Sequence, residues 1–243
     1  MGQELLQCDK TGDSRWIITL NRPEKRNALS DDLVGALLAC LADARAQDIA
    51  SLVFRGEGRN LSAGFDFTDF DTVSQADLLW RFVRVQQLLS EVLSYPGLTI
   101  AVGHGRNFGA GCDLFAACKV RIATADARFR MPGVLFGLVL GTRRLGQLIG
   151  ESHASRIQLS ATEFDSEEAL RLGFATEILK DGDGEARAAI DRLTQAVAGL
   201  APATRHAITD VLAVKAEHED MGRLVASVMQ GDIKQRLAKY LGK

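Results

Sequence analysis

Short apolar runs that suit buried strands alternate with amphipathic helical patterns along most of the chain. Strand-type runs lie at 16–20 (WIITL), 51–56 (SLVFRG) and 98–103 (LTIAVG). Helical patterns lie between them, at 31–47 and at 76–93. A strand that is followed by a helix and another strand packs as a parallel pair with a right-handed crossover. The alternation therefore predicts the α/β class and a mainly parallel sheet.

The ends of these elements carry their own signals. Ser30 precedes an acid-started helical pattern, so we expect its side chain to cap this helix. The Tyr-Pro-Gly run at 95–97 predicts the end of the second helix. Further short strands are expected at 119–124, 127–131 and 174–179, the last of them within a mostly helical final third.

The composition excludes several classes of partner. The chain has 243 residues, 47% of them hydrophobic, and a formal net charge of −2. A nearly neutral chain is not expected to use nucleic acid or an anionic membrane as its main partner. The four cysteines, Cys8, Cys40, Cys112 and Cys118, form no CxxC and no Cys/His pattern, which predicts reduced thiols and no metal site. With no signal-peptide run and no membrane-spanning stretch, we expect a cytoplasmic protein.

The stretch Arg106–Lys119 (RNFGAGCDLFAACK) places a turn of small residues just ahead of a helix. It does not match the dinucleotide fingerprint, because the third glycine position of that motif is Leu114. It is not a P-loop, since no Gly-Lys-Ser/Thr follows. Free amides at a helix start carry partial positive charge, and small side chains let a ligand approach them. The turn therefore predicts half of an oxyanion hole, and Ala63 in NLSAGFDF offers a second amide.

Four motifs that follow one another along the chain resemble the signatures of one family. They are NRPEKRNALS (21–30), LSAGFDF (61–67), GHGRNFGAGCDL (103–114) and EEALRLGFATEI (167–178). In this order and spacing they resemble the crotonase superfamily, the enoyl-CoA hydratase/isomerase proteins. The resemblance implies a crotonase-like spiral of ββα units over 1–195 and a helical C-terminal region over 196–243 that forms trimers, often paired into hexamers. It also implies an acyl-CoA thioester as ligand, with coenzyme A as part of the substrate and no separate cofactor.

The resemblance also assigns site residues. The two oxyanion amides fall on Ala63 and Ala110. The CoA channel falls on residues of two turns and of the chain end, namely Lys25, Arg26, Ala28, Ser62, Gly64, Asp66, Tyr240 and Lys243. Acyl-CoA reactions of this family pass through an enolate or a tetrahedral oxyanion, and one preorganised donor stabilises such a species by about 3–4 kcal/mol.

The chain departs from the family pattern at the acids. A hydratase of this family uses two glutamates, and their positions fall here on Asp113 and on Gly133, which has no carboxyl group. The loop after Gly133 is also shorter than the family's. We therefore expect altered chemistry with Asp113 as the sole acid or base, which suits isomerisation better than hydration. Two alternatives stay open: an acyl-CoA-binding protein with little or no turnover, and a CoA-thioester hydrolase or lyase of the same fold.

Other polar residues near these motifs have structural interpretations. His104 and Asn107 are expected to form hydrogen bonds within their turn, and Cys112 to be a small buried residue. Glu163 is interpreted as a solvated charge. The pair Arg143 and Arg144 is expected at a helix start, in a structural role or at a subunit contact.

Overall fold

A six-stranded sheet forms the centre of the computed structural model, which describes residues 4–10, 14–180, 183–213 and 216–243. Its strands, in spatial order, are β1 (Leu6–Asp9), β2 (Arg15–Leu20), β3 (Ser51–Gly56), β4 (Leu98–Gly103), β6 (Val120–Thr124) and β9 (Glu177–Leu179). All neighbours pair in parallel except β1, which runs antiparallel to β2 at the edge. The prediction of an α/β fold with a mainly parallel sheet is confirmed.

A second, smaller sheet contains β5 (Arg106–Phe108), β7 (Arg128–Arg130) and β8 (Phe164–Asp165). The chain adds β4 and then β6 to the large sheet, and each is followed by a strand of the small sheet, β5 and then β7. No strand was predicted at 106–108, but these residues pair in parallel with β7. A strand this short has no periodicity of its own, so only the partner strand reveals it.

Ten helices and two 3-10 turns connect and cover these strands in the described part of the chain. They are η1 (Pro23–Lys25), α1 (Asp31–Ala46), α2 (Gln75–Leu93), α3 (Ala110–Ala117), η2 (Pro132–Phe136), α4 (Thr142–Ile149), α5 (Glu151–Ser160), α6 (Ser166–Leu172), α7 (Asp183–Ala198), α8 (Pro202–Leu212), α9 (Glu217–Val228) and α10 (Ile233–Leu241). The predicted cap of α1 is confirmed, because the Ser30 hydroxyl accepts a hydrogen bond from the Leu33 amide at 3.3 Å.

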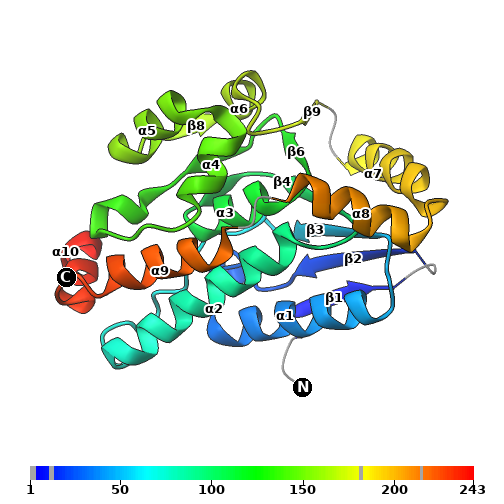
Figure 1. Ribbon diagram of the computed structural model, residues 1–243. Helices are drawn as coiled ribbons and strands as arrows, with labels where there is room; N and C mark the ends of the chain where they lie inside the picture. The colour runs from blue at the N-terminus through cyan, green and yellow to red at the C-terminus, as the bar shows by residue number, and fades with distance from the viewer. Residues whose placement is uncertain (1–3, 11–13, 181–182, 214–215) are drawn as a thin grey trace.

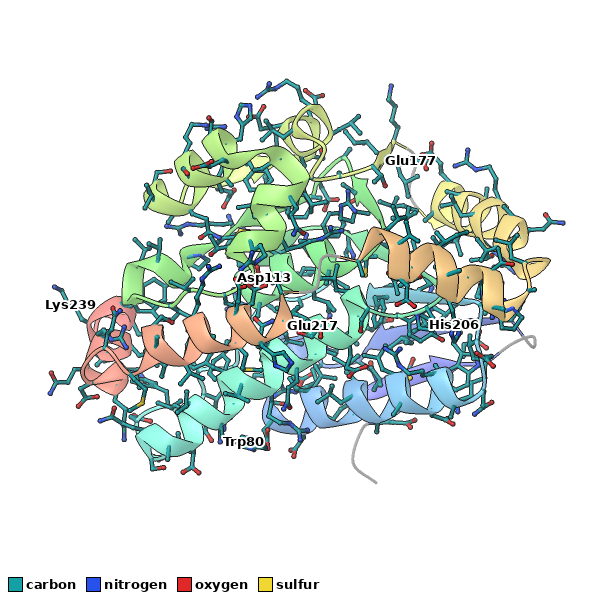
Figure 2. The ribbon with its side chains drawn as sticks, in the orientation of Figure 1. Trp80, Asp113, Glu177, His206, Glu217 and Lys239 are labelled. Carbon is teal, nitrogen blue, oxygen red and sulfur yellow. The ribbon has the colours of Figure 1, made fainter. Side chains whose placement is uncertain are left out.

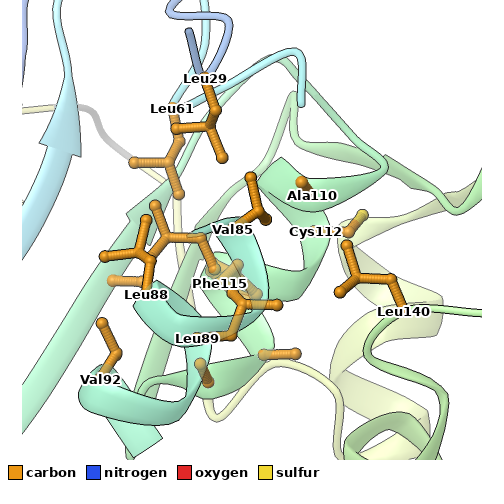
Figure 3. Packing of buried hydrophobic residues seen from close by; sticks show 14 of the residues in the cluster. Leu29, Leu61, Val85, Leu88, Leu89, Val92, Ala110, Cys112, Phe115 and Leu140 are labelled. Atoms are coloured by element: carbon orange, nitrogen blue, oxygen red, sulfur yellow. The ribbon is translucent and has the colours of Figure 1, made fainter. Parts of the chain in front are cut away.

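The large sheet is covered on both faces. Along β3, Leu52 and Phe54 point into the main core, whereas Val53 points to the opposite face, where it packs in a cluster with residues of α7. The main core lies between the sheet and α1, α2 and α3 (Figure 1). Figure 3 shows where α2 meets α3, with Val85 and Leu89 close to Phe115. Each fully buried side chain of this size contributes roughly 1.5–3 kcal/mol, so the packing fixes α3 firmly.

The last two helices pack on the core of their own chain. α9 lies along α2, and α10 lies against η2 (Figure 1). The Lys234 ammonium donates to the carbonyl oxygens of Asp71 and Val73 at 2.8 and 2.9 Å, and Arg236 donates to the carbonyl oxygen of Phe136 at 3.0 Å. The Arg236 contact and the packing of α10 against η2 place the chain end over the segment that contains Gly133. The predicted boundary between 195 and 196 stays a prediction.

No helix in the described residues combines the length and apolar character that crossing a bilayer requires.

Arg121 on β6 joins the large sheet to the turn ahead of β9. Its side chain is 5% exposed, and it donates only to backbone carbonyl oxygens. These belong to Phe174 (2.6 Å), Cys118 (2.9 Å), Lys119 (3.0 Å) and Gly173 (3.2 Å). One guanidinium thus satisfies carbonyl groups from two segments far apart in sequence, which makes it a structural rather than a catalytic cation.

We expect Arg121→Met to lower the free energy of unfolding by about 3–5 kcal/mol, because it leaves several buried carbonyls without donors. The matched control is Arg192→Met, which removes an exposed ion pair with Glu177 (Figure 2) and should cost under about 1 kcal/mol. Urea unfolding followed by circular dichroism measures both values. Equal effects of the two substitutions would refute the structural role of Arg121.

Candidate active site

A cavity of about 450 Å³ lies among η1, the loop at 63–68, the start of α3, η2 and α10. Its apolar wall consists mainly of Phe65, Phe67, Phe82, Phe108, Phe136, Leu138 and Leu140. Phe65 and Phe82 stack with ring centroids 4.2 Å apart, and the Phe136 ring lies 5.1 Å from the Tyr240 ring. The cavity is therefore a largely apolar space whose wall combines parts of the chain that lie far apart in the sequence.

Asn27 ties together the two loops at the mouth of this cavity. It is fully buried, and its amide group donates to the carbonyl oxygens of Glu57 and Asn60, both at 2.9 Å. Its side-chain oxygen accepts a hydrogen bond from the Arg22 amide at 2.9 Å. The turn before α1 and the loop after β3 are thus held as one unit, and backbone amides in them have fixed directions.

The predicted role of the Ala63 amide is wrong. Ala63 does line the cavity, but its N–H donates to the carbonyl oxygen of Arg26 at 2.9 Å and is not free for a ligand. The Gly64 carbonyl accepts from the Leu29 amide at 2.7 Å. In a trans peptide the N–H points opposite to the C=O, so the N–H of Phe65 points away from Leu29. The available donor is therefore the N–H of the Gly64–Phe65 peptide, two residues beyond Ala63.

Two amides remain without acceptors at this point of the cavity, within the part of the chain that the structure describes. One is the amide of Phe65, and the other is that of Ala110, the first residue of α3, which has no intrahelical acceptor. Gly64 brings them together: its φ is +90°, and a Cβ there would lie 2.4 Å from the Phe108 carbonyl oxygen and 3.1 Å from the Ala110 nitrogen. Only glycine, which has no Cβ, lets this loop approach the start of α3 so closely.

Asp113 lies one turn into α3, in the interior behind α9 (Figure 2). The residue is 6% exposed, lines the cavity, and its Oδ1 atom has no hydrogen-bond partner among the described residues. Burial raises the pKa of this carboxyl well above its ordinary value. The space for it depends on Gly141, where a Cβ would lie 1.9 Å from Oδ1. The carboxyl is therefore held neutral over a wider pH range than an exposed aspartate.

The raised pKa makes stability depend on pH in a defined direction. Because the folded state holds the Asp113 proton above the ordinary pKa of aspartate, stability falls as the pH rises from about 4 toward the folded pKa. Asparagine does not titrate, so only the wild type loses this stability as the pH rises. The melting temperature of Asp113→Asn, relative to that of the wild type, should therefore be higher at about pH 8 than at about pH 5. Thermal unfolding at both pH values measures it.

A control for this pH effect is Asp71→Asn, which removes the carboxyl of an exposed residue outside the cavity. A difference for Asp113→Asn that does not change with pH would mean that burial does not raise the pKa of Asp113.

Gly133 lies in η2 and lines the same cavity, so the position of the second family glutamate is part of the site but carries no acid. The other carboxyls of the described lining are Glu24, which is exposed, and Asp66. Asp66 accepts from Arg22 at 2.9 Å and from the Thr68 amide at 3.0 Å. Burial acts to raise the pKa of Asp66, but these hydrogen bonds outweigh it and lower the pKa. Asp113 is thus the one buried and unpaired carboxyl of this lining.

The residues assigned to a CoA channel divide into two groups. Lys25, Arg26, Ala28, Asp66 and Tyr240 line the cavity.

The remaining three have other contacts. Ser62 is fully buried, and its hydroxyl donates to the Asn27 carbonyl at 2.7 Å and accepts from the Gly64 amide at 3.1 Å, so it shapes the loop instead of contacting a ligand. Gly64 acts through its backbone, as described above. The Lys243 ammonium lies 5.0 Å from the centre of the Phe70 ring and does not line the cavity.

The structural interpretations of nearby residues are consistent with their contacts. Asn107 is fully buried, accepts from the Leu61 amide at 3.2 Å and donates to the carbonyls of His104 and Gly105. The His104 ring contacts the Gly58 carbonyl oxygen at 3.1 Å. Cys112 is buried and donates to the Asn107 carbonyl. In the described residues no three or more His, Cys, Asp or Glu side chains gather as metal ligands.

Sequence reasoning missed the Phe65 amide and the partner of Asp66. Nothing in LSAGFDF alone separates the Phe65 amide from the Ala63 amide, because residues two apart in an extended segment direct their N–H groups the same way. Arg22 lies next to the predicted basic turn, but nothing in the sequence pairs it with an acid that lies 44 residues later.

Comparisons with known proteins identify the family of the chain. The family model described as enoyl-CoA hydratase/isomerase matches residues 11–242. A Bacillus subtilis (strain 168) protein named probable enoyl-CoA hydratase is 33% identical over 170 residues, which cover 68% of this chain and 66% of that protein.

Solved structures extend the agreement to the fold. A Bordetella parapertussis crystal structure described as an enoyl-CoA hydratase/isomerase superposes with a TM-score of 0.96 at 46% identity, covering 99% of this chain and 100% of that one. The enoyl-CoA hydratase structure from Bacillus halodurans gives a TM-score of 0.84 at 26% identity, covering 97% and 100%. The predicted crotonase-like fold is therefore confirmed, and the chain belongs to the enoyl-CoA hydratase/isomerase family of the crotonase superfamily.

Proposed function

We propose that the protein binds an acyl-CoA thioester and stabilises its enolate with the amides of Phe65 and Ala110. The observation that carries this proposal is the pair of acceptor-free amides brought together by Gly64 at an apolar cavity. A thioester carbonyl oxygen at this point receives two preorganised donors, and the dipole of α3 adds to the positive potential. Negative charge that develops on this oxygen is stabilised more than the neutral carbonyl, which lowers the barrier to enolate formation.

Asp113 serves in this proposal as the sole acid–base group. It lies three residues after Ala110 on the same helix face, so a thioester held by the Ala110 amide has its α-carbon near this carboxyl. In its ionised form, one carboxylate that removes a proton from one carbon and returns it to another performs an isomerisation, and the raised pKa makes this carboxylate a stronger base than an exposed aspartate. Hydration also needs a group that activates water, and Gly133 supplies none. The favoured reaction is therefore the shift of a double bond in an enoyl-CoA.

The mouth of the cavity supports the choice of a CoA thioester. Lys25 and Arg26 line it without a carboxylate partner among the described residues, and they suit the phosphates of CoA. Tyr240 adds an aromatic surface from α10. Coenzyme A enters as part of the substrate, with no separate cofactor.

We also propose that the protein assembles as a trimer or a pair of trimers. Light scattering that returned the mass of one chain, 26.3 kDa, would refute this assembly.

Calorimetry tests the proposed ligand class. We expect acetyl-CoA and butyryl-CoA to bind, and free acetate and butyrate not to bind. Replacing both Lys25 and Arg26 by glutamine should weaken butyryl-CoA binding by about tenfold or more, since charge-assisted bonds to phosphate are lost. The control is Lys239→Gln, which removes an exposed cation of α10 outside the cavity (Figure 2). No binding of either CoA ester would end the proposal.

A second candidate function is acyl-CoA binding with little turnover. The missing carboxyl at Gly133 favours it, because half of the family's acid–base pair is gone. A turnover screen with saturated, 2-enoyl and 3-enoyl CoA esters separates the two functions. Isomerisation of 3-enoyl esters supports the enzyme, and binding of all three without conversion supports the second candidate.

A further inference from the structure

Two cysteines outside the cavity lie close enough to react with each other. Cys8 on β1 and Cys40 on α1 have sulfur atoms 3.7 Å apart, and both side chains are half-buried. A disulfide bond has an S–S distance of about 2.05 Å, so the two sulfurs need to approach by only about 1.7 Å. Both cysteines have a single side-chain rotation that moves the sulfur, and β1 and α1 already pack against each other at this point.

The surroundings give a reagent access to this pair. A surface groove is lined by Cys8 and Cys40 together with Lys10 and Asp43, whose ammonium and carboxylate are 2.8 Å apart. Burial raises the pKa of both thiols, that of Cys40 to about 12, whereas the Lys10 charge acts to lower both. Cys8, whose pKa is shifted less, is therefore the thiol that ionises and reacts first.

We propose that Cys8 and Cys40 are a modification site at which a small disulfide such as oxidised glutathione is exchanged for an intrachain disulfide. The Cys8 thiolate attacks one glutathione sulfur, which forms a mixed disulfide and releases one glutathione thiolate. The Cys40 thiolate then attacks the Cys8 sulfur, which forms the Cys8–Cys40 bond and releases the second glutathione. Two protein thiols are oxidised, one glutathione disulfide is reduced to two thiols, and the two protons go to the released glutathione.

The bond has a predictable physical effect. β1 is an edge strand that pairs only with β2 in the described sheet, and it also packs against α1. A covalent link to α1 constrains the unfolded chain and holds this edge in place. We therefore expect a rise in melting temperature on the order of 5 °C on oxidation, which a reductant reverses.

The other two cysteines provide an internal comparison. Cys112 and Cys118 are fully buried, and burial raises the pKa of Cys118 to about 12. Neither lies in the groove that contains Cys8 and Cys40. They should keep free thiols in the folded protein under conditions that oxidise the half-buried pair Cys8 and Cys40.

The experiment exposes the folded full-length protein to oxidised glutathione at mildly alkaline pH and maps disulfides by non-reducing peptide mass spectrometry. We expect a cross-link between the peptides of Cys8 and Cys40, loss of two free thiols and the reversible rise in melting temperature. Cys40→Ser should stop at a glutathione adduct on Cys8, and Cys8→Ser should form no cross-link. Neither variant should gain stability on oxidation.

Several results would overturn the inference. If the wild type stops at a stable Cys8–glutathione adduct and forms no cross-link, the Cys40 sulfur cannot reach the Cys8 sulfur. Protection of both thiols until denaturant is added shows that the groove excludes the reagent. Cross-links through Cys112 or Cys118 would show that Cys8 and Cys40 are not the reactive pair. None of these outcomes depends on acyl-CoA binding, so they leave the proposed function unaffected.

Discussion

Replacing Ala110 by proline is expected to slow the exchange of an acyl-CoA α-proton with solvent by about 10²–10³-fold. Proline has no N–H, so the substitution removes one of the two amides that we propose to stabilise the enolate. The first position of a helix tolerates proline, because its fixed φ suits the helix and the N–H there has no intrahelical acceptor. The fold should therefore survive while the donor is lost. Proton magnetic resonance of butyryl-CoA in heavy water measures the exchange rate.

The matched control is Ala110→Ser, which keeps the amide and adds one small polar atom. It should retain most of the exchange rate, and both variants should show the circular dichroism spectrum of the wild type. Equal exchange rates in Ala110→Pro and the wild type would show that this amide does not stabilise the charge, and the proposed enolate mechanism would fall.

Asp113→Asn is expected to lower isomerisation of a 3-enoyl-CoA by about 10²–10⁴-fold. The side chain keeps its shape but can no longer accept or deliver a proton, and the described lining offers no second buried, unpaired carboxyl. Butyryl-CoA binding should persist, because the amides and the basic turn are unchanged. Steady-state turnover together with calorimetry measures both properties. Unchanged turnover would show that Asp113 is not catalytic, and its place in the first turn of α3 would then reflect only the favourable helix dipole.

The companion substitution is Gly133→Glu, which restores a carboxyl at the second family position. A Cβ at Gly133 meets the Leu138 carbonyl oxygen at 3.4 Å, an ordinary contact, so the backbone there tolerates a Cβ. Crotonyl-CoA hydration should rise above the wild-type level but stay below that of a two-glutamate enzyme, since about 1 Å of misplacement costs on the order of 10²-fold. Rapid hydration by the unmodified protein would show that water is activated by another group.

The repeated strands and helices followed from local pattern. The strand and helix runs predicted at 16–20, 31–47 and 51–56 correspond to β2, α1 and β3 with their ends displaced by at most one residue. Hydrophobic period and capping act over a few neighbouring residues, so they can be read directly from the sequence. The 174–179 run was only partly a strand, because β9 begins at Glu177 and the residues before it turn around Arg121.

The site was harder to predict where it depended on the direction of single bonds. The motif LSAGFDF indicated an amide, but the structure gives the Ala63 N–H to the Arg26 carbonyl and leaves the Phe65 N–H available. Ala63 and Phe65 are two residues apart, so in a regular strand their N–H groups would point the same way, but Gly64 between them has a positive φ and breaks this regularity. Which peptide faces the cavity depends on the partner loop at 22–29, and no pattern within the motif records it.

The sequence by itself determined the α/β class, the turn of small residues followed by a helix after β5, and the absence of an acid at Gly133, because these depend on residue type and local spacing. Tertiary structure alone decided that Asp113 is buried without a partner, that Asp66 is paired with Arg22, and that two amides meet at Gly64. Burial and pairing are sums over contacts between segments distant in sequence, and pKa values and free donors follow from those sums. The chemistry of the site is therefore a property of the packed molecule.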